Sequence, residues 1–212
     1  MKKIIGLIAA VAMMLSVNVC ALDCSLTNES DGPVGILTAP DGMKYEIKGR
    51  VVNAPSPLAV QDSEKSITYA YDVTIPRSSG SLEGNQQVDP SVSLIAYVTV
   101  YWEEITKGVF TGVLLTDTSV RWTTSDNVRV DFASLTAIMK GSSLADMGYD
   151  PFIDVHQTFN NAVNGRIYST NFSQHVQRGG VMPVVGSYAY FELSHGSAST
   201  WSFQTANTNV PV

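Results

Sequence analysis

The 212-residue sequence is poor in cysteine and in charge. It contains only two cysteines, and charged residues make up 15% of it. Two cysteines are too few for a disulfide-stapled miniprotein or a four-cysteine zinc site. No basic block occurs, and 13 Lys and Arg residues stand against 19 Asp and Glu residues. Nucleic-acid binding is therefore not expected, because phosphate recognition depends on Lys and Arg. The 44% of apolar residues is enough for a folded core.

The familiar catalytic motifs are also missing. The chain has no Gly-x-Ser-x-Gly elbow, no His-Glu-x-x-His pair, no P-loop and no dinucleotide fingerprint. His156, His175 and His195 would each need a nearby Ser or Asp to act as a catalytic base. Serine is so frequent here that such proximity is expected by chance, and no spacing supports a three-histidine zinc site. The sequence favours a non-catalytic protein, with a secreted hydrolase that uses a dispersed Ser/His/Asp site as the alternative.

The first 21 residues have the pattern of a secretory signal peptide. Lys2 and Lys3 precede an apolar run over 4–17, and Val19 and Ala21 occupy the −3 and −1 positions of a cleavage site. The run is shorter than the about 20 residues that a membrane span needs. Cleavage would leave 22–212 as a single domain with one cysteine, Cys24, and a net charge more negative than the −6 of the whole chain. We expect a secreted, extracellular or cell-surface protein without a membrane span after processing.

Apolar residues recur at every second position through most of the remaining chain, which is typical of half-buried β-strands. The clearest case is 66–76, where Ile67, Tyr69 and Tyr71 share one face. Residues 92–102 are apolar on both faces and predict a central strand. Asp41-Gly42 is a hairpin signal. Further strands are predicted at 43–52, 109–115, 118–123, 127–133, 166–172, 187–195 and 200–205.

These patterns predict an all-β domain, a mainly antiparallel β-sandwich of jelly-roll or immunoglobulin-like type with about eight to ten strands. The stretch 134–163 departs from the alternation. Leu135, Ile138 and Met139 have helical spacing, and Asp150-Pro151 is a suitable start for a second helix. We expect an insert here, either one or two short helices or a long ordered loop.

Three aspartates recur at every fourth position of this insert. On a helix, Asp146, Asp150 and Asp154 would share one face and repel one another, and a bound Ca²⁺ would relieve the repulsion. They lack the glycine of a calcium-binding loop, so they are weak metal candidates and a solvated acidic loop is the favoured interpretation. No other cofactor is expected.

Aromatic side chains are the stronger indication of a binding site. Sugar-binding β-proteins stack rings on exposed Trp and Tyr, whereas a buried Trp serves the core. We assign Trp102 and Trp201 to the core, and choose Trp122, Tyr149 and Tyr168 as candidate ligand-binding residues. The predicted function is an exported binding or surface-structural protein whose partner is a carbohydrate or a protein at a cell surface. Self-association through exposed sheet edges is a further expectation.

Overall fold

The computed structural model describes residues 32–52, 64–75, 93–125, 127–144, 151–195, 200–208, 210 and 212. The predicted signal peptide over 1–21 and Cys24 lie outside the described residues. The described residues form eleven strands and no helix, and accordingly none of them forms a helix able to cross a membrane. The strands are β1 (Val34–Thr38), β2 (Lys44–Val52), β3 (Lys65–Val73), β4 (Leu94–Lys107), β5 (Phe110–Thr124), β6 (Val128–Ser142), β7 (Phe152–Asn160), β8 (Ile167–Ser169), β9 (Val176–Gln177), β10 (Val184–His195) and β11 (Thr200–Asn207).

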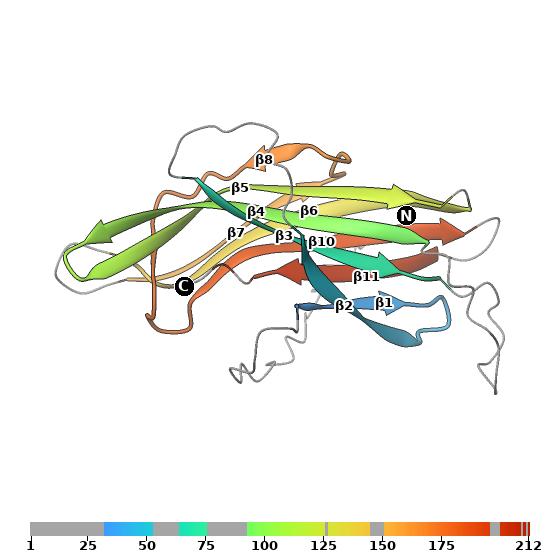
Figure 1. The fold of residues 1–212 in the computed structure, drawn as a ribbon, viewed down its shortest axis with the longest axis horizontal. Helices are drawn as coiled ribbons and strands as arrows, with labels where there is room; N and C mark the ends of the chain where they lie inside the picture. The colour runs from blue at the N-terminus through green and yellow to red at the C-terminus, as the bar shows by residue number, and fades with distance from the viewer. Residues whose placement is uncertain are drawn as a thin grey trace, which may run out of the picture.

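All pairings between these strands are antiparallel, and they form one continuous sheet in the order β7-β6-β10-β11-β1-β2-β3-β4-β5-β8, with β9 also paired to β5. The long strands β4, β5, β6 and β10 follow the long axis of the molecule (Figure 1). The predicted all-β antiparallel class is confirmed. A sandwich of two separate sheets is not confirmed, because the hydrogen-bonded path does not break.

Strand β2 turns the sheet back on itself. Its residues 44–48 pair with β1, whereas its residues 49–52 pair with β3. The change of partner falls at Gly49, where a Cβ would lie 2.8 Å from the Tyr71 ring and 2.9 Å from the Pro33 carbonyl oxygen. Glycine is therefore required at this corner, as is common where strands switch direction or backbones approach closely. We call the strands from β7 to β1 the first layer and the strands from β3 to β8, with β9, the second layer.

The inner faces of the two layers meet in an aromatic core. Tyr71 and Phe203 come from different layers and pack edge to face with ring centroids 5.8 Å apart. Trp122 and Phe191 meet across the layers in the same way at 5.7 Å. Each fully buried large side chain of this kind contributes about 1.5–3 kcal/mol relative to an exposed one. The inward face predicted for 66–76 is confirmed, since Tyr71 is fully buried; its burial raises the pKa of the phenol to about 12.

A polar belt divides the interior into two apolar clusters. It consists of three fully buried polar residues, Thr118, Ser187 and Asn207. Along the chain, each of them lies between residues of one apolar cluster and residues of the other. The hydroxyl oxygens of Thr118 and Ser187 lie 2.6 Å apart across the layers. Asn207 Nδ2 donates to the carbonyl oxygens of Ile67, at 3.0 Å, and Val98, at 2.9 Å. These bonds attach the end of β11 to the second layer.

The expectation for 134–163 was wrong, because β6 and β7 fill most of this stretch. Leu135 and Met139 do lie on one face, but that face belongs to a strand and Ala137 lies between them at 0% exposure. Ala137 is small and only weakly hydrophobic, so the alternation typical of a strand was hard to recognise here. Ile138 lies on the opposite face of the strand, and its spacing from Leu135 resembled that of a helix. Pairing of β6 with both β10 and β7 decided the outcome. Similarly, 109–115 and 118–123 merge into the single strand β5, which has a bulge at Thr116.

Gly186→Ala should destabilise the fold, because a Cβ at this position would lie 2.1 Å from Asn207 O and 2.6 Å from Thr208 Cα. Both contacts are to backbone, so the two strands must separate, at a cost of roughly 1–3 kcal/mol or more. Urea unfolding followed by fluorescence measures this cost. Gln204→Ala, at an exposed position of the neighbouring strand, is the control and should change the unfolding free energy by less than about 0.5 kcal/mol. Equal midpoints for the two variants would contradict the packing described here.

Candidate functional site

A surface depression of about 150 Å³ lies beside Trp122. Trp122 belongs to β5 in the second layer, whereas most of the opposite wall comes from β6 in the first layer. The chain just after β7 completes the lining. The lining residues are Trp122, Val130, Asp131, Phe132, Ala133, Asn161 and Ala162. The depression therefore exists only because the folded sheet brings its two layers together.

A β-bulge places Asp131 at this depression. Phe132 pairs with Glu192 and Val130 pairs with Leu193, which leaves Asp131 as the extra residue. Bulges commonly redirect side chains next to functional sites. The pKa of this carboxyl is lower than its usual value, mainly because Ser194 forms a hydrogen bond with it. The Arg129 guanidinium, whose Nε lies 2.6 Å from Asp131 Oδ1, lowers the pKa further. Asp131 is therefore an ionised acceptor at neutral pH.

The Trp122 side chain is half-buried and its backbone is held from two sides. Its N–H donates to Asn164 Oδ1 at 2.9 Å, and Asn164 Nδ2 donates back to its carbonyl oxygen at 2.9 Å. The adjacent Gly165 N–H donates to Val120 O at 2.9 Å, with a positive φ of 78° that suits glycine. The Asn164-Gly165 turn thus connects β7 to β8 across the layers and holds the backbone of Trp122 in place. The indole itself packs edge to face on the Phe191 ring, with the ring centroids 5.7 Å apart.

Tyr168, the second candidate aromatic, supports the site from behind. Its ring lies 4.8 Å from that of Phe159, and the Arg166 guanidinium lies 5.2 Å from the ring centroid. Its hydroxyl oxygen accepts a hydrogen bond of 2.7 Å from the Val163 N–H, within the turn that holds Trp122. Tyr168 is half-buried against the larger cluster and does not line the depression. Tyr149, the third candidate, lies outside the described residues.

The sequence did not indicate Asp131 and Asn161 as site residues. Asp131 follows the alternation of a predicted strand, where a polar residue normally faces solvent. Asn161 follows β7 and has a positive φ of 54°, a conformation that asparagine tolerates better than most residues. A bulge depends on pairing with a distant strand, so neither residue carried a local signal.

The three candidate metal-binding aspartates are not brought together among the described residues. Asp146 and Asp150 lie outside the described residues. Asp154 belongs to strand β7, so the prediction that it lies on a helix is wrong. Its carboxylate is occupied by His156 Nε2 at 2.9 Å and Lys140 Nζ at 3.3 Å. The bond from His156, followed by Lys140, keeps the pKa of Asp154 low. In the part of the chain that the structure describes, no three His, Cys, Asp or Glu side chains gather as metal ligands would.

The three histidines lie apart from the depression. His156 is exposed on β7, and His195 is half-buried at the end of β10. His175 has a buried Nε2 that makes no hydrogen bond, with Glu103 Oε1 at 3.5 Å. Burial lowers the pKa of His175, and the carboxylate of Glu103 opposes that shift. The hydrolase alternative therefore remains a prediction without a located site.

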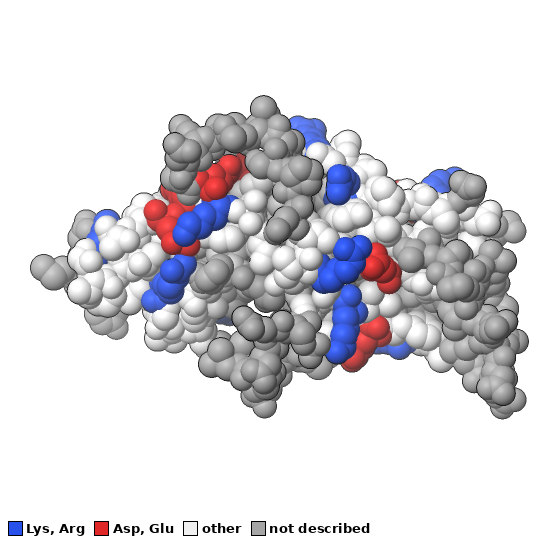
Figure 2. Space-filling model, viewed as in Figure 1, with Lys and Arg blue, Asp and Glu red and all other residues white. Residues whose placement is uncertain are grey.

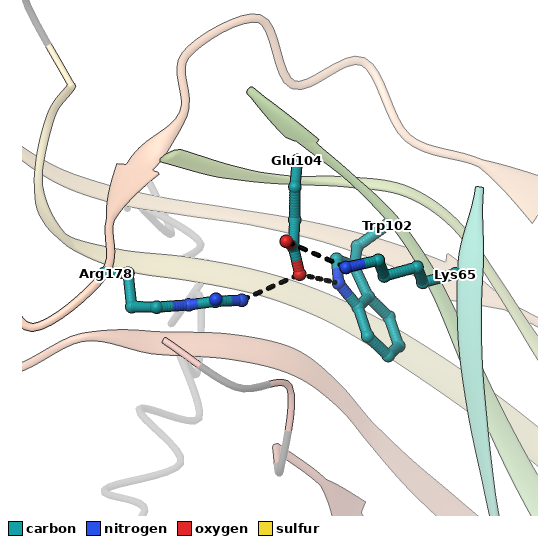
Figure 3. A network of polar contacts seen from close by, with 4 residues as sticks. All are labelled: Lys65, Trp102, Glu104 and Arg178. Atoms are coloured by element: carbon teal, nitrogen blue, oxygen red, sulfur yellow. Dashed lines mark hydrogen bonds and ion pairs between the residues drawn. The ribbon is translucent and has the colours of Figure 1, made fainter. Parts of the chain in front are cut away.

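Glu104 lies at the centre of a polar cluster that also contains Lys65, Trp102 and Arg178 (Figure 3). Its Oε1 accepts hydrogen bonds from Trp102 Nε1 at 3.2 Å and Arg178 Nη2 at 2.7 Å. Its Oε2 lies 2.9 Å from Lys65 Nζ. The carboxylate therefore joins β3, β4 and the turn after β9. Trp102 and Trp201 are buried at 5% and 7% exposure, which agrees with the core role expected of them.

Glu104→Gln should lower stability in a pH-dependent way. The bond from Lys65, followed by those from Trp102 and Arg178, lowers the pKa of Glu104 despite its partial burial. A lowered carboxyl pKa in the folded state stabilises the protein above the unfolded pKa of about 4.3, and this contribution disappears as pH falls through the folded pKa. We expect a loss of about 1 kcal/mol at pH 7 and a smaller loss at pH 3. Urea titrations at the two pH values test this, and a difference independent of pH would contradict it.

A scan against protein-family models finds no match to this chain, and searches of curated proteins and of solved structures also find none.

Proposed function

We propose that the protein is an exported, non-catalytic binding protein that holds a carbohydrate unit at the Trp122 depression. The observation that carries the proposal is a half-buried indole, packed on Phe191, that lines a depression together with an ionised carboxylate and an asparagine. The C–H face of a sugar ring packs well on an aromatic ring, and its hydroxyl groups donate to carboxylate and amide oxygens. Trp122 supplies the first contact, and Asp131 and Asn161 supply the second.

The size of the depression limits what it holds. At about 150 Å³ it is smaller than the roughly 300–1,000 Å³ of pockets that enclose a drug-sized ligand. It therefore suits a single sugar unit, such as the end of a longer glycan, with the remainder of the glycan in solvent. Weak affinity for one unit, increased when several copies act together, is the expected behaviour.

The distribution of charge supports a neutral ligand. On the face drawn in Figure 2, the acidic side chains lie next to basic ones. The pairs Arg50–Asp72, at 3.0 Å, and Lys65–Glu104, at 2.9 Å, are examples of this local neutralisation. Together with the net charge of −6, this surface disfavours a polyanionic partner. A neutral glycan meets no such penalty.

Asp131→Asn should weaken glycan binding about 10-fold while leaving the fold intact, because a charged acceptor bonds sugar hydroxyls more strongly than a neutral amide. The ligand is first selected on a glycan array and then titrated by intrinsic tryptophan fluorescence. Trp102 and Trp201 are buried, so the signal should come from Trp122 and disappear in Trp122→Phe.

The matched control is Asp72→Asn, an ion-paired aspartate on β3. It should bind as well as the native protein does. If no glycan binds, or if Asp131→Asn and Asp72→Asn bind equally well, the proposal is wrong. Urea unfolding of each variant separates a loss of binding from a loss of folding.

A further inference from the structure

We propose that two copies of this protein join through strand β7, which pairs antiparallel with β7 of the second copy about a two-fold axis at Val155. β7 is the last strand at one end of the sheet order, and β6 is its only partner among the described strands. The sequence predicts self-association through exposed sheet edges, and this proposal assigns it to one strand and one register. It does not depend on the carbohydrate site.

The pairing of β7 with β6 shows which of its backbone groups point away from the sheet. Ser143 N–H donates to Pro151 O at 3.0 Å, so these two residues form a hydrogen-bonded pair that continues the β6–β7 register. Hydrogen-bonded and non-hydrogen-bonded pairs alternate along an antiparallel ladder. The odd-numbered residues of β7 therefore bond to β6, and the N–H and C=O groups of its even-numbered residues, from 152 to 160, point outward. Within the described part of the chain, no backbone group bonds to this outward row.

The outward row is exposed along the whole strand. All five even-numbered residues of β7 are exposed, and its pairing with β6 runs without a bulge. Natural edge strands avoid further pairing by being very short, or by means of proline, lysine or a bulge. β7 is nine residues long and contains neither proline nor lysine, whereas β8 and β9 at the other end of the order have three and two residues. An edge of this kind accepts a further β-strand, because a strand satisfies its backbone groups in regular alternation.

Backbone geometry restricts how a second β7 can pair with the first. The outward groups belong to even-numbered residues in both copies, so each hydrogen-bonded pair must join two even-numbered residues. The two-fold axis then passes through a residue, and the central choices are Asp154, Val155 and His156. An axis at Asp154 places this carboxylate opposite its own copy, which is unfavourable, and an axis at His156 places the imidazole opposite itself. An axis at Val155 places Asp154 opposite His156 of the second copy on both sides of the axis.

Charge complementarity identifies the second copy as the strand that fits this edge. Within one copy, Asp154 Oδ1 lies 2.9 Å from His156 Nε2, and Asp154 Oδ2 lies 3.3 Å from Lys140 Nζ. The aspartate and histidine side chains are 46% and 51% exposed, so each can also meet a partner across the edge. In the Val155 register the four side chains alternate around the axis, and each carboxylate has an imidazole beside it on both strands.

Apolar contacts add to this register. Val155 is 38% exposed and meets its own copy on the axis, in a non-hydrogen-bonded pair where side chains lie closest. Phe152, which is 50% exposed, lies opposite Thr158 of the second copy. Aromatic and β-branched side chains opposite each other stabilise a sheet. β7 is therefore complementary to itself in backbone, charge and apolar contact at once.

Analytical ultracentrifugation over a range of concentrations tests the proposal. The native protein should form dimers, and His156→Asp should raise the dimer dissociation constant at least about tenfold, because it places carboxylates opposite each other. The double variant Asp154→His with His156→Asp should recover the dimer, since only the Val155 register again sets an acid opposite a base. His195→Asp is the matched control, because it changes the net charge equally but lies at the end of β10. It should dimerise as the native protein does.

Cross-linking tests the register directly, in a chain whose Cys20 and Cys24 are replaced by serine. On the axis, the two Val155 Cα atoms would lie about 4.5 Å apart, within the range of about 4.4–6.8 Å that a disulfide spans. Val155→Cys should therefore give a disulfide-linked dimer under mild oxidation. Thr158→Cys is the control, because position 158 would lie about 20 Å from its own copy and should remain unlinked.

Four results would overturn the proposal. They are a monomer at every concentration up to about 1 mM, a dimer that His156→Asp leaves unchanged, a double variant that stays monomeric, and equal cross-linking of the two cysteine variants. The second result would assign the dimer to another surface. Urea unfolding confirms that each variant is folded. Trp122→Phe should dimerise normally, so failure of the carbohydrate site and failure of the β7 interface are distinguished.

Discussion

One continuous sheet forms this protein's core only because β2 changes partner midway along its length. Gly49 lies at that corner, with the Tyr71 ring where a side chain would be. Once the sheet turns there, the inner faces of β3, β4 and β5 meet those of β10 and β11, and rings from the two layers interlock. The depression beside Trp122 follows from the same fold, because its walls come from β5 and β6, strands that are not paired with each other.

The interior polar belt gives the stacked layers a defined register. Apolar side chains alone tolerate sliding of one layer over the other, because the hydrophobic effect has no directional preference. Asn207 Nδ2 donates to carbonyl oxygens of two strands at once, and the Thr118 hydroxyl meets that of Ser187, so these hydrogen bonds form in only one alignment of the layers. The alignment also separates the two ends of the molecule. The Trp122 depression lies at the surface of one of the two apolar clusters and shares Ala133 and Ala162 with it.

A rigid β-scaffold holds binding residues in position at little entropic cost on binding. The β4–β5 hairpin, with fourteen and fifteen residues in its strands, spans the distance between the two ends.

Local pattern was a good guide to strands with a strong inside–outside contrast and a poor guide elsewhere. The strand predicted at 66–76 was found at 65–73, and the predicted central strand was found between β3 and β5. Strand β6 was cut short in the prediction because Ala137 is small and Ile138 is apolar on the opposite face. Strand β7 was missed because it lies at the end of the sheet order with mostly exposed residues, which removes the alternation. The sequence indicated Trp122 as a candidate binding residue, but it did not predict that Asp131 and Asn161 line the same depression.

The sequence by itself determined the all-β class, the low positive charge and the short-range turns such as Asp41-Gly42, because these depend on residue type and period along the chain. Only the tertiary structure decided the corner at Gly49 and the bulge at Asp131. These features arise where segments far apart in sequence pair or stack. No residue carries a local mark of the partner it will meet across the sheet.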